Sequence, residues 1–175
     1  NVTLVGVINA DTALHLPDFR AAERTFCLVT QVAGRTGRGD KGGRVLVQTF
    51  NPENPTIQAA EQHDFERFAE QEIPEREQFG YPPFRQLARI VVRGESEVFA
   101  GAFATQIGEE LRKRIKVSGD DIRVLGPAAA PINKLRGKYR FHLFASGADG
   151  ELLRRMISEV TGQLRTPNEI QWIVD

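Results

Sequence analysis

The clearest chemistry lies in residues 31–38, where Gln31, Gly34, Arg35 and Arg38 belong to a Q-x-x-G-R-x-G-R pattern. The glycines let the backbone turn tightly while it presents the two arginines. An arginine guanidinium stays charged and offers fixed donors to phosphate oxygens. When it meets the charge that develops on a γ-phosphate, it raises the rate of phosphoryl transfer by roughly 10³–10⁵. The pattern therefore predicts contacts to a nucleoside triphosphate. The alternative is a glycine-rich turn with solvated arginines.

A second candidate site lies near the C-terminus, where four cations are interleaved with aromatic rings. The cations are Lys134, Arg136, Lys138 and Arg140, and the rings are Tyr139 and Phe141. Because cations hold phosphates and rings stack bases, the pattern favours single-stranded or forked DNA. Strand alternation places all four cations on one face if the strand begins early, whereas Gly137 can reorient the first two. We expect the rings in the core and the cations toward DNA.

Composition sets limits on the class of protein. The chain has 175 residues with 41% apolar residues, 23 basic and 23 acidic side chains, and no net charge. These values exclude a disordered tail, and no apolar run is long enough for a membrane span. The single cysteine, Cys27, excludes a disulfide framework and a cysteine-based zinc site in this chain. No signal peptide opens the chain, so we expect a cytoplasmic protein.

The neutral total conceals a charge pattern. Residues 1–49 carry six basic and four acidic side chains, residues 50–80 carry two and eight, and residues 81–175 carry fifteen and eleven. An acidic middle segment therefore separates two basic ends, which is the basis for three predicted regions. They are residues 1–55, an acidic helical linker at 56–80, and a C-terminal domain at 81–175.

The elements around the arginine pattern predict a βαβ unit. Residues 2–8 are apolar and β-branched, which is typical of a fully buried strand. A helix is expected to start at Pro17–Asp18 with Asp18 as its N-cap and to be stopped by Gly34, Gly37 and Gly39. A second strand follows at 44–50, and a parallel pairing is expected. Because the chain begins on a core strand, we expect it to be a piece of a longer protein.

The rest of the chain predicts an α+β domain. The acidic helical segment 56–79 is expected to kink or divide at Pro74. The expected strands are 86–92, 122–125, 139–145 and 170–174, and the expected helices are 97–115 and 151–164. Their order, β-α-β-β-α-β, is the arrangement of ferredoxin-like folds.

Several stretches carry a family resemblance. Residues 1–50 resemble the end of the second RecA-like lobe of superfamily 2 helicases, with QVAGRTGR similar to helicase motif VI. Five segments resemble the PriA family of replication-restart helicases, also called primosomal protein N′. These segments are VTLVGVINAD, DFRAAERTF, QVAGRTGRGDKGGRVLVQTFNPENPTIQAA, EREQFGYPPF and KLRGKYRFHL. The resemblance is collinear and covers nearly the whole chain.

The resemblance implies roles for the motif residues. Arg35 and Arg38 match the family's arginine fingers on the γ-phosphate of ATP, which is bound with Mg²⁺. Gln31 and Gly34 belong to the same nucleotide-contacting motif. The family's phosphate-binding loop, acidic DExH box and zinc-binding cysteines lie upstream of the matching region. We therefore expect this segment alone to be inactive as an ATPase and to hold no zinc.

The resemblance also implies a function and partners. The intact protein would be a bacterial ATP-dependent 3′–5′ DNA helicase that recognises stalled forks and promotes primosome assembly and replication restart. Its expected partners are forked and single-stranded DNA, other primosome proteins and the tail of single-stranded DNA-binding protein, with Arg154 as a candidate contact. The alternative is a fork-binding platform that has lost ATPase activity. An upstream phosphate-binding loop and acidic box would distinguish the helicase from the platform.

Overall fold

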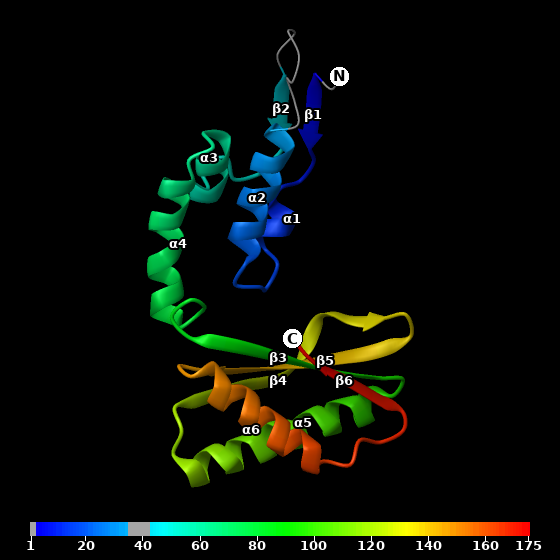
Figure 1. The fold of residues 1–175 in the computed structure, drawn as a ribbon. Helices are drawn as coiled ribbons and strands as arrows, with labels where there is room; N and C mark the ends of the chain where they lie inside the picture. Colours follow the sequence, from blue (N-terminus) through cyan, green and yellow to red (C-terminus); the bar gives the residue numbers. More distant parts are fainter. Residues whose placement is uncertain (1–2, 35–42) are drawn as a thin grey trace. The chain divides into compact units, whose positions relative to one another are not determined.

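The structure, a computed structural model, describes residues 3–34 and 43–175. The chain divides into two compact units, Asn1–Phe79 and Gly80–Asp175, which are drawn in Figure 1. We call them the N-terminal and C-terminal units. Each has a hydrophobic cluster of its own, so each is described by itself.

A βαβ arrangement forms the first part of the N-terminal unit. Strands β1 (Leu4–Val7) and β2 (Arg44–Val47) pair in parallel along their whole length. The connection between them contains the short helix α1 (Asp11–Leu14) and the longer helix α2 (Ala21–Ala33). The parallel pairing and the longer helix between the strands are confirmed, whereas α1 lies where a loop was expected for residues 9–16.

The structure corrects the expected burial of the first strand. Exposure alternates along β1, and the Leu4 side chain is 58% exposed. Among the described residues only β2 pairs with β1. A two-stranded sheet has too few neighbours to bury both of its faces, so its apolar side chains stay partly in solvent.

The structure also corrects the start of the second helix. Helix α2 begins at Ala21, and no side chain caps it. The Asp18 carboxylate instead accepts the Arg20 N–H at 3.0 Å and forms a salt bridge with Arg24 at 2.8 Å. A short acidic side chain can accept a hydrogen bond from a backbone N–H of a turn and not from the N–H groups at the start of a helix. Asp18 does so here.

The acidic segment forms two helices, α3 (Pro55–Glu61) and α4 (Phe65–Phe79). They are separated at His63, whose φ of 56° lies in the left-handed region and ends the first helix. Pro74 lies inside α4, so it does not divide this segment, and the alternative of a kink at Pro74 stays a prediction. The division therefore occurs eleven residues earlier than the proline suggested, at a residue with no strong breaking propensity.

Both acidic helices pack against α2 within the N-terminal unit. Its hydrophobic cluster joins α2 to α3 and α4 through five buried residues. They are Phe26, Val29, Ala59, Ala60 and Phe68. The segment that we expected as a linker is thus grouped with the first unit almost to its end.

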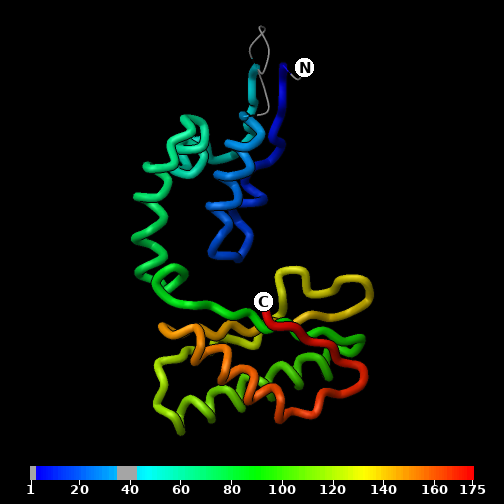
Figure 2. Tube along the Cα trace, in the orientation of Figure 1, coloured from blue at the N-terminus to red at the C-terminus, as the bar shows by residue number. Residues whose placement is uncertain are grey.

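The C-terminal unit follows the order strand, helix, strand, strand, helix, strand. Its elements are β3 (Gln86–Gly94), α5 (Glu97–Ser118), β4 (Ile122–Leu135), β5 (Lys138–Gly147), α6 (Gly150–Gln163) and β6 (Ile170–Val174). The strands form one antiparallel sheet in the order β4-β5-β3-β6. Both helices lie against the same face of this sheet (Figures 1 and 2). The predicted order of elements is confirmed.

Sixteen buried residues form the core between the helices and the sheet. Alternate residues of each strand point into it, as the period of a strand requires. Ile90 of β3 and Leu143 and Ala145 of β5 have no exposed surface, and Ile107 of α5 packs with them. The residues between them on the strands therefore point to the opposite face, which no helix of this unit covers.

Strand β4 is longer than expected, because it extends ten residues beyond the predicted end at Leu125. Its pairing with β5 is irregular on both sides of the segment Ala128–Ala129. The prolines Pro127 and Pro131 lie in these irregular stretches. Proline cannot donate to a sheet ladder, so it is tolerated mainly on edge strands and at bulges, and β4 is an edge strand.

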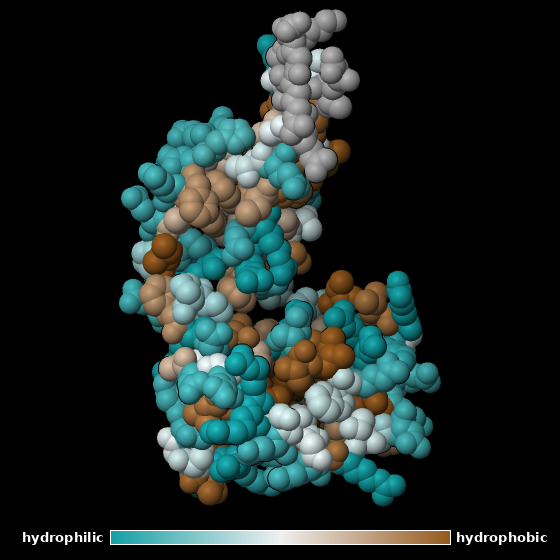
Figure 3. Space-filling view, in the orientation of Figure 1, coloured by the Kyte–Doolittle hydropathy of each residue, from teal (hydrophilic) through white to brown (hydrophobic). Residues whose placement is uncertain are grey.

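Apolar side chains reach the surface of both units (Figure 3). Ile8 is 81% exposed, Phe50 89% and Val117 82%. Within the described residues, the helices are too short or too polar to cross a membrane.

Candidate nucleotide motif and nucleic-acid interface

Helix α2 positions the first residues of the arginine pattern. Gln31 lies exposed in its last turn, and the helix ends at Ala33 with the Gly34 N–H donating to the Thr30 carbonyl at 3.0 Å. The two candidate fingers, Arg35 and Arg38, lie outside the described residues. Their predicted contacts to a phosphate stay a prediction.

The backbone at Gly34 does not itself require glycine. Its φ of −66° and ψ of −10° are helical. A Cβ placed there would meet the Thr30 and Gln31 carbonyl oxygens at 3.6 and 3.7 Å, which is ordinary van der Waals contact. The helix therefore stops near the predicted position for a reason other than a left-handed glycine.

Aromatic stacking anchors the middle of α2. The Phe26 ring stacks on Phe68 of α4 with centroids 4.6 Å apart, and it meets Phe65 edge-on at 6.2 Å. Such ring pairs contribute about 0.5–1.5 kcal/mol beyond the burial of their area. The helix that leads into the arginine pattern is thereby fixed against the acidic helix.

A second attachment between these helices is ionic. Arg76 of α4 donates to Glu23 of α2 at 2.8 Å and to Glu72 of its own helix at 3.0 Å. The guanidinium also lies over the Phe19 ring, 5.5 Å from its centroid. Burial lowers the pKa of Arg76, but its bonds to the two carboxylates outweigh this and raise the pKa overall. The acidic helix is thus tied to the base of α2.

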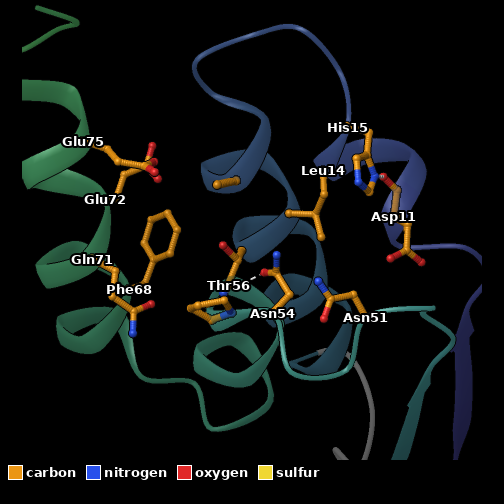
Figure 4. Close-up of a pocket in the computed structure, with 12 residues that line it drawn as sticks. Asp11, Leu14, His15, Asn51, Asn54, Thr56, Phe68, Gln71, Glu72 and Glu75 are labelled. Atoms are coloured by element: carbon orange, nitrogen blue, oxygen red, sulfur yellow. Dashed lines mark hydrogen bonds between the residues drawn. The ribbon is translucent and has the colours of Figure 1, made fainter. Parts of the chain in front are cut away.

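A cavity of about 300 Å³ lies inside the N-terminal unit. Figure 4 shows Glu72 and Glu75 reaching into it from α4, with Asp11 and His15 on the side of α1. Carboxylates repel phosphate groups at short range. This cavity therefore does not suit the phosphates of a nucleotide, and the arginine pattern is not part of its described lining.

Asp11, which lines this cavity, has a structural task that sequence reasoning missed. Its two oxygens accept the Thr49 hydroxyl at 2.8 Å and the Phe50 N–H at 2.9 Å. The Phe50 N–H lowers the pKa of Asp11 most, burial opposes it, and the Thr49 hydroxyl adds to the lowering. The carboxylate joins α1 to the end of β2. The available signal was an acid shortly after the strand predicted at 2–8.

Of the two arrangements that the sequence left open for the four cations, the structure has the one in which they do not share a face. Arg136 and Gly137 form the turn between β4 and β5, with φ of 51° and 80°. Leu135 and Lys138 are opposite each other, and so are Lys134 and Tyr139. Directly opposed residues of an antiparallel pair point to the same side. The turn therefore places Lys134 on the side of Tyr139 and not with Lys138, which is the reorientation by Gly137 that the sequence left open.

Contacts agree with this division of the cations. The Lys134 ammonium lies 4.4 Å from the centre of the Tyr139 ring and 3.3 Å from its hydroxyl. Lys138 instead donates to Gln171 of β6 at 3.0 Å. Arg140 is opposite Arg93 of β3. Lys138 and Arg140 thus lie on the sheet face that the helices leave uncovered, and Arg136 lies exposed at the turn.

The rings between the cations lie as expected for core side chains. Phe141 packs against the core beside Gly101 of α5. Tyr139 is half-buried under Lys134. These rings point toward the helix side, so they are not the aromatic groups that the uncovered face presents.

The other candidates remain separate from this surface. Arg154 is exposed on α6, in the helix layer. Cys27 is exposed on α2, and the described residues contain no group of three His, Cys, Asp or Glu that could hold a metal ion. The described part of the chain thus offers no fit for the zinc of the resembled family.

Sequence reasoning missed three arginines of the uncovered face. They are Arg89, Arg93 and Arg123. The available signal was the alternation of Arg89, Val91 and Arg93 along a strand whose other residues are apolar. Only the pairing of strands distant in sequence shows that they join Arg140.

These features define a mixed α/β protein of two units, with an arginine pattern after a helix of the first and a basic sheet face on the second. Comparison with known families identifies it further, since residues 77–175 match the family described as the primosomal protein N C-terminal domain. The chain belongs to the PriA family.

Individual relatives agree with this assignment. The replication restart protein PriA of Bacillus subtilis is 45% identical over 141 residues, which cover 81% of this chain and 17% of the relative. PriA of Treponema pallidum is 38% identical over 164 residues, covering 94% of this chain and 24% of the relative. PriA of Chlamydia pneumoniae is 48% identical over 94 residues, or 54% of this chain and 13% of the relative. The chain therefore spans no more than about a quarter of the length of these relatives.

Proposed function

We propose that this chain is the C-terminal part of an ATP-dependent 3′–5′ DNA helicase that recognises stalled forks and promotes primosome assembly and replication restart. The observation that carries the proposal is the Q-x-x-G-R-x-G-R pattern at the end of α2 in a parallel βαβ unit of a PriA family member. Replication restart is the role in the names of its relatives.

At the level of the fold, the N-terminal unit would be the last part of a RecA-like lobe. Its parallel strands with a helical crossover support this. The C-terminal unit would be a ferredoxin-like domain, which the element order and the strand order β4-β5-β3-β6 support.

In the intact protein, Arg35 and Arg38 would contact the γ-phosphate of ATP, with Gln31 and Gly34 beside them. Glycine at 34, where the helix tolerates a Cβ, supports close approach of a ligand or another lobe to this backbone. ATP and Mg²⁺ would be held mainly by the phosphate-binding loop and acidic box of an upstream lobe. The 175-residue chain alone would then be inactive as an ATPase.

The C-terminal unit would bind branched and single-stranded DNA through Lys134, Arg136, Lys138 and Arg140. Further proposed partners are other primosome proteins and the tail of single-stranded DNA-binding protein, with Arg154 as a contact. The setting would be the bacterial cytoplasm. Any zinc would be bound upstream, since the described residues do not fit it.

The test of the ATPase role uses a longer protein that joins the upstream helicase region to this chain. Arg35→Ala or Arg38→Ala should lower kcat for DNA-stimulated ATP hydrolysis by about 10³-fold or more. Arg24→Ala is the matched control, because Arg24 is an exposed arginine of α2 paired with Asp18.

The 175-residue chain should show no Mg²⁺-dependent turnover of ATP in the same assay. If the longer protein binds forks and neither it nor its arginine variants hydrolyse ATP, the chain belongs to a non-catalytic platform. Turnover by the 175-residue chain that is lost in Arg35→Ala would contradict its expected inactivity.

A further inference from the structure

The sheet face opposite α5 and α6 carries a set of cations that the fold assembles from three of the four strands. On one side of the sheet, Ile90, Leu143 and Ile122 point into the core. Their neighbours along the strands must point to the other side. This side, which we call the open sheet face, is defined by six residues. They are Arg93, Arg123, Lys138, Arg140, His142 and Phe144.

The register brings these residues together although they are far apart in sequence. Arg93 of β3 lies directly opposite Arg140 of β5 and, on its other side, opposite Gln171 of β6. Gln171 in turn accepts a hydrogen bond from Lys138. Three cations and one amide therefore form a cluster across three strands at one end of the face.

Most of this positive charge is not neutralised. Among the described residues, no carboxylate forms a salt bridge with Arg93, Arg123 or Arg140. A further arginine on this side, Arg89, is paired with Asp175. Arg93 and Arg123 are exposed, so their guanidinium groups are available to a ligand. Like charges placed opposite each other, such as Arg93 and Arg140, destabilise a sheet unless a partner is bound.

Aromatic and apolar groups lie between these cations. The rings of His142 and Phe144 are neighbours on β5, with centroids 5.0 Å apart and planes at 56°. Phe144 is opposite Leu125 of β4, which is 67% exposed, and Ile173 of β6 is 54% exposed. The face thus combines flat apolar groups with cations at both ends.

The titration of His142 agrees with this charge distribution. Burial lowers its pKa most, and the charges of Arg89 and Arg140 lower it further. A neutral imidazole beside two guanidinium groups keeps an aromatic surface between cations.

We propose that the open sheet face binds an unpaired DNA strand, with phosphates on Arg93, Arg140, Lys138 and Arg123 and bases on His142 and Phe144. The inference rests on the proposed role of the C-terminal unit in DNA binding. Four-stranded sheets with aromatic side chains on an open face suit splayed bases, and cations beside the rings follow the backbone. A broad sheet does not enter a duplex groove, which admits a helix or a two-stranded ribbon.

The test measures binding of a fluorescein-labelled oligothymidine to the 175-residue chain by anisotropy at several salt concentrations. The double variant Arg93→Gln/Arg140→Gln should lose on the order of tenfold in affinity. Its slope of log K against log salt should become shallower by about 1.4, at roughly 0.7 for each phosphate contact on a single strand. The matched control is Lys116→Gln/Arg155→Gln, which removes the same charge from exposed positions of α5 and α6.

A second variant separates stacking from charge. Phe144→Leu keeps an apolar side chain but removes the ring, so affinity should fall at least about fivefold with an unchanged salt slope. Trp172, the single tryptophan of the chain, lies in this unit and reports whether each variant is folded.

Several results would overturn the proposal. One is equal loss in the sheet variant and the helix control, which would mean that only bulk charge matters. Another is equal affinity for a duplex of the same length with the same dependence on the variants. A third is displacement of the oligonucleotide by polyglutamate at equal charge concentration, which would favour an acidic protein segment. If forked DNA binds and only Lys134→Gln/Arg136→Gln weakens it, the open sheet face fails while the proposed DNA-binding role stands.

Discussion

The two units differ in how completely they bury their apolar side chains. The C-terminal unit closes sixteen buried residues between two helices and a four-stranded sheet, whereas the cluster of the N-terminal unit has five. Both strands of the N-terminal unit alternate between exposed and half-exposed residues, while Ile90 and Val92 in the centre of β3 have no exposed surface. Stability from burial is thus concentrated in the second unit.

This difference shows two ways of presenting functional residues. In the N-terminal unit, the arginine pattern follows a helix that is held by a few specific contacts, mainly the Phe26–Phe68 stack and the Arg76–Glu23 ion pair. In the C-terminal unit, a large core fixes the strands, and the strands position the cations of the open sheet face. A change to one buried residue should therefore affect the first unit more than the second.

The largest expected effect is that of Phe68→Ala in the N-terminal unit. Removing a buried phenylalanine costs about 3–5 kcal/mol, which is a large share of what a five-residue cluster supplies. Far-UV circular dichroism should show loss of helix at low temperature, while the Trp172 fluorescence transition stays in place. Phe50→Ala is the matched control, since Phe50 is 89% exposed in the same unit. If the variant kept the helix content of the wild type, the stabilities of the two units would be coupled more strongly than their separate cores indicate.

A smaller effect is expected for Leu143→Ala in the C-terminal unit. Leu143 has no exposed surface, and such a truncation costs about 2–5 kcal/mol. The unit should remain folded at room temperature, with a lowered midpoint in denaturant for Trp172 fluorescence. Leu125→Ala, at a side chain that is 67% exposed, should shift the midpoint little. Equal shifts in both variants would contradict the location of the core.

The sequence predicted the elements wherever a periodic pattern decided them. Alternation in 139–145 and the helical period in 97–115 gave the right elements, because each face there meets either core or solvent. It failed where a local competitor decided the outcome. Asp18 caps a turn and not a helix, and the helix break falls at His63 and not at Pro74.

For the candidate sites, the sequence located segments better than faces. The cations around Gly137 were recognised, but a two-residue turn with positive φ separated Lys134 from Lys138. Arg93 and Arg123 were missed because nothing local connects them with Arg140. Strand pairing does so, and pairing between distant strands leaves little trace in a single sequence.

At Gly34, one substitution is expected to change stability and ATPase activity in opposite directions. Gly34→Ala places a Cβ at ordinary contact distances in a helical backbone, so the N-terminal unit should gain about 0.4–1 kcal/mol. The same substitution in a longer protein with ATPase activity should lower kcat, if close approach to this backbone is what glycine permits. Thermal unfolding followed by circular dichroism and a steady-state ATPase assay measure the two effects. A gain in stability with unchanged kcat would leave glycine at 34 without the proposed task.

The smallest expected effect is a pH dependence of the stability of the C-terminal unit. The positions of the histidines assign this effect to one unit. His142 is the single histidine of the C-terminal unit, and His15 and His63 lie in the other. Its pKa in the folded state is lowered from 6.5, by burial first and then by the charges of Arg89 and Arg140. In the window between the folded pKa and 6.5, the unfolded chain therefore binds more protons than the folded one. The stability that comes from neutral His142 is present above 6.5 and is lost as the pH falls through the folded pKa.

Denaturation followed by Trp172 fluorescence across this pH range should show a decline that His142→Gln removes and Arg140→Gln weakens. His15→Gln should leave the decline unchanged. A bound phosphate near Arg140 would supply negative charge and raise the folded-state pKa of His142 toward 6.5, so an oligonucleotide should make the decline smaller than in a free sample. A decline in this range that survives His142→Gln would contradict its assignment to His142. Carboxylates such as Asp121 and Asp149 supply a separate decline, because their pKa values are lowered by bonds to Arg85 and to the α6 N–H groups. Those carboxylates titrate below 3.8, so the pH at which the decline begins distinguishes the two sources.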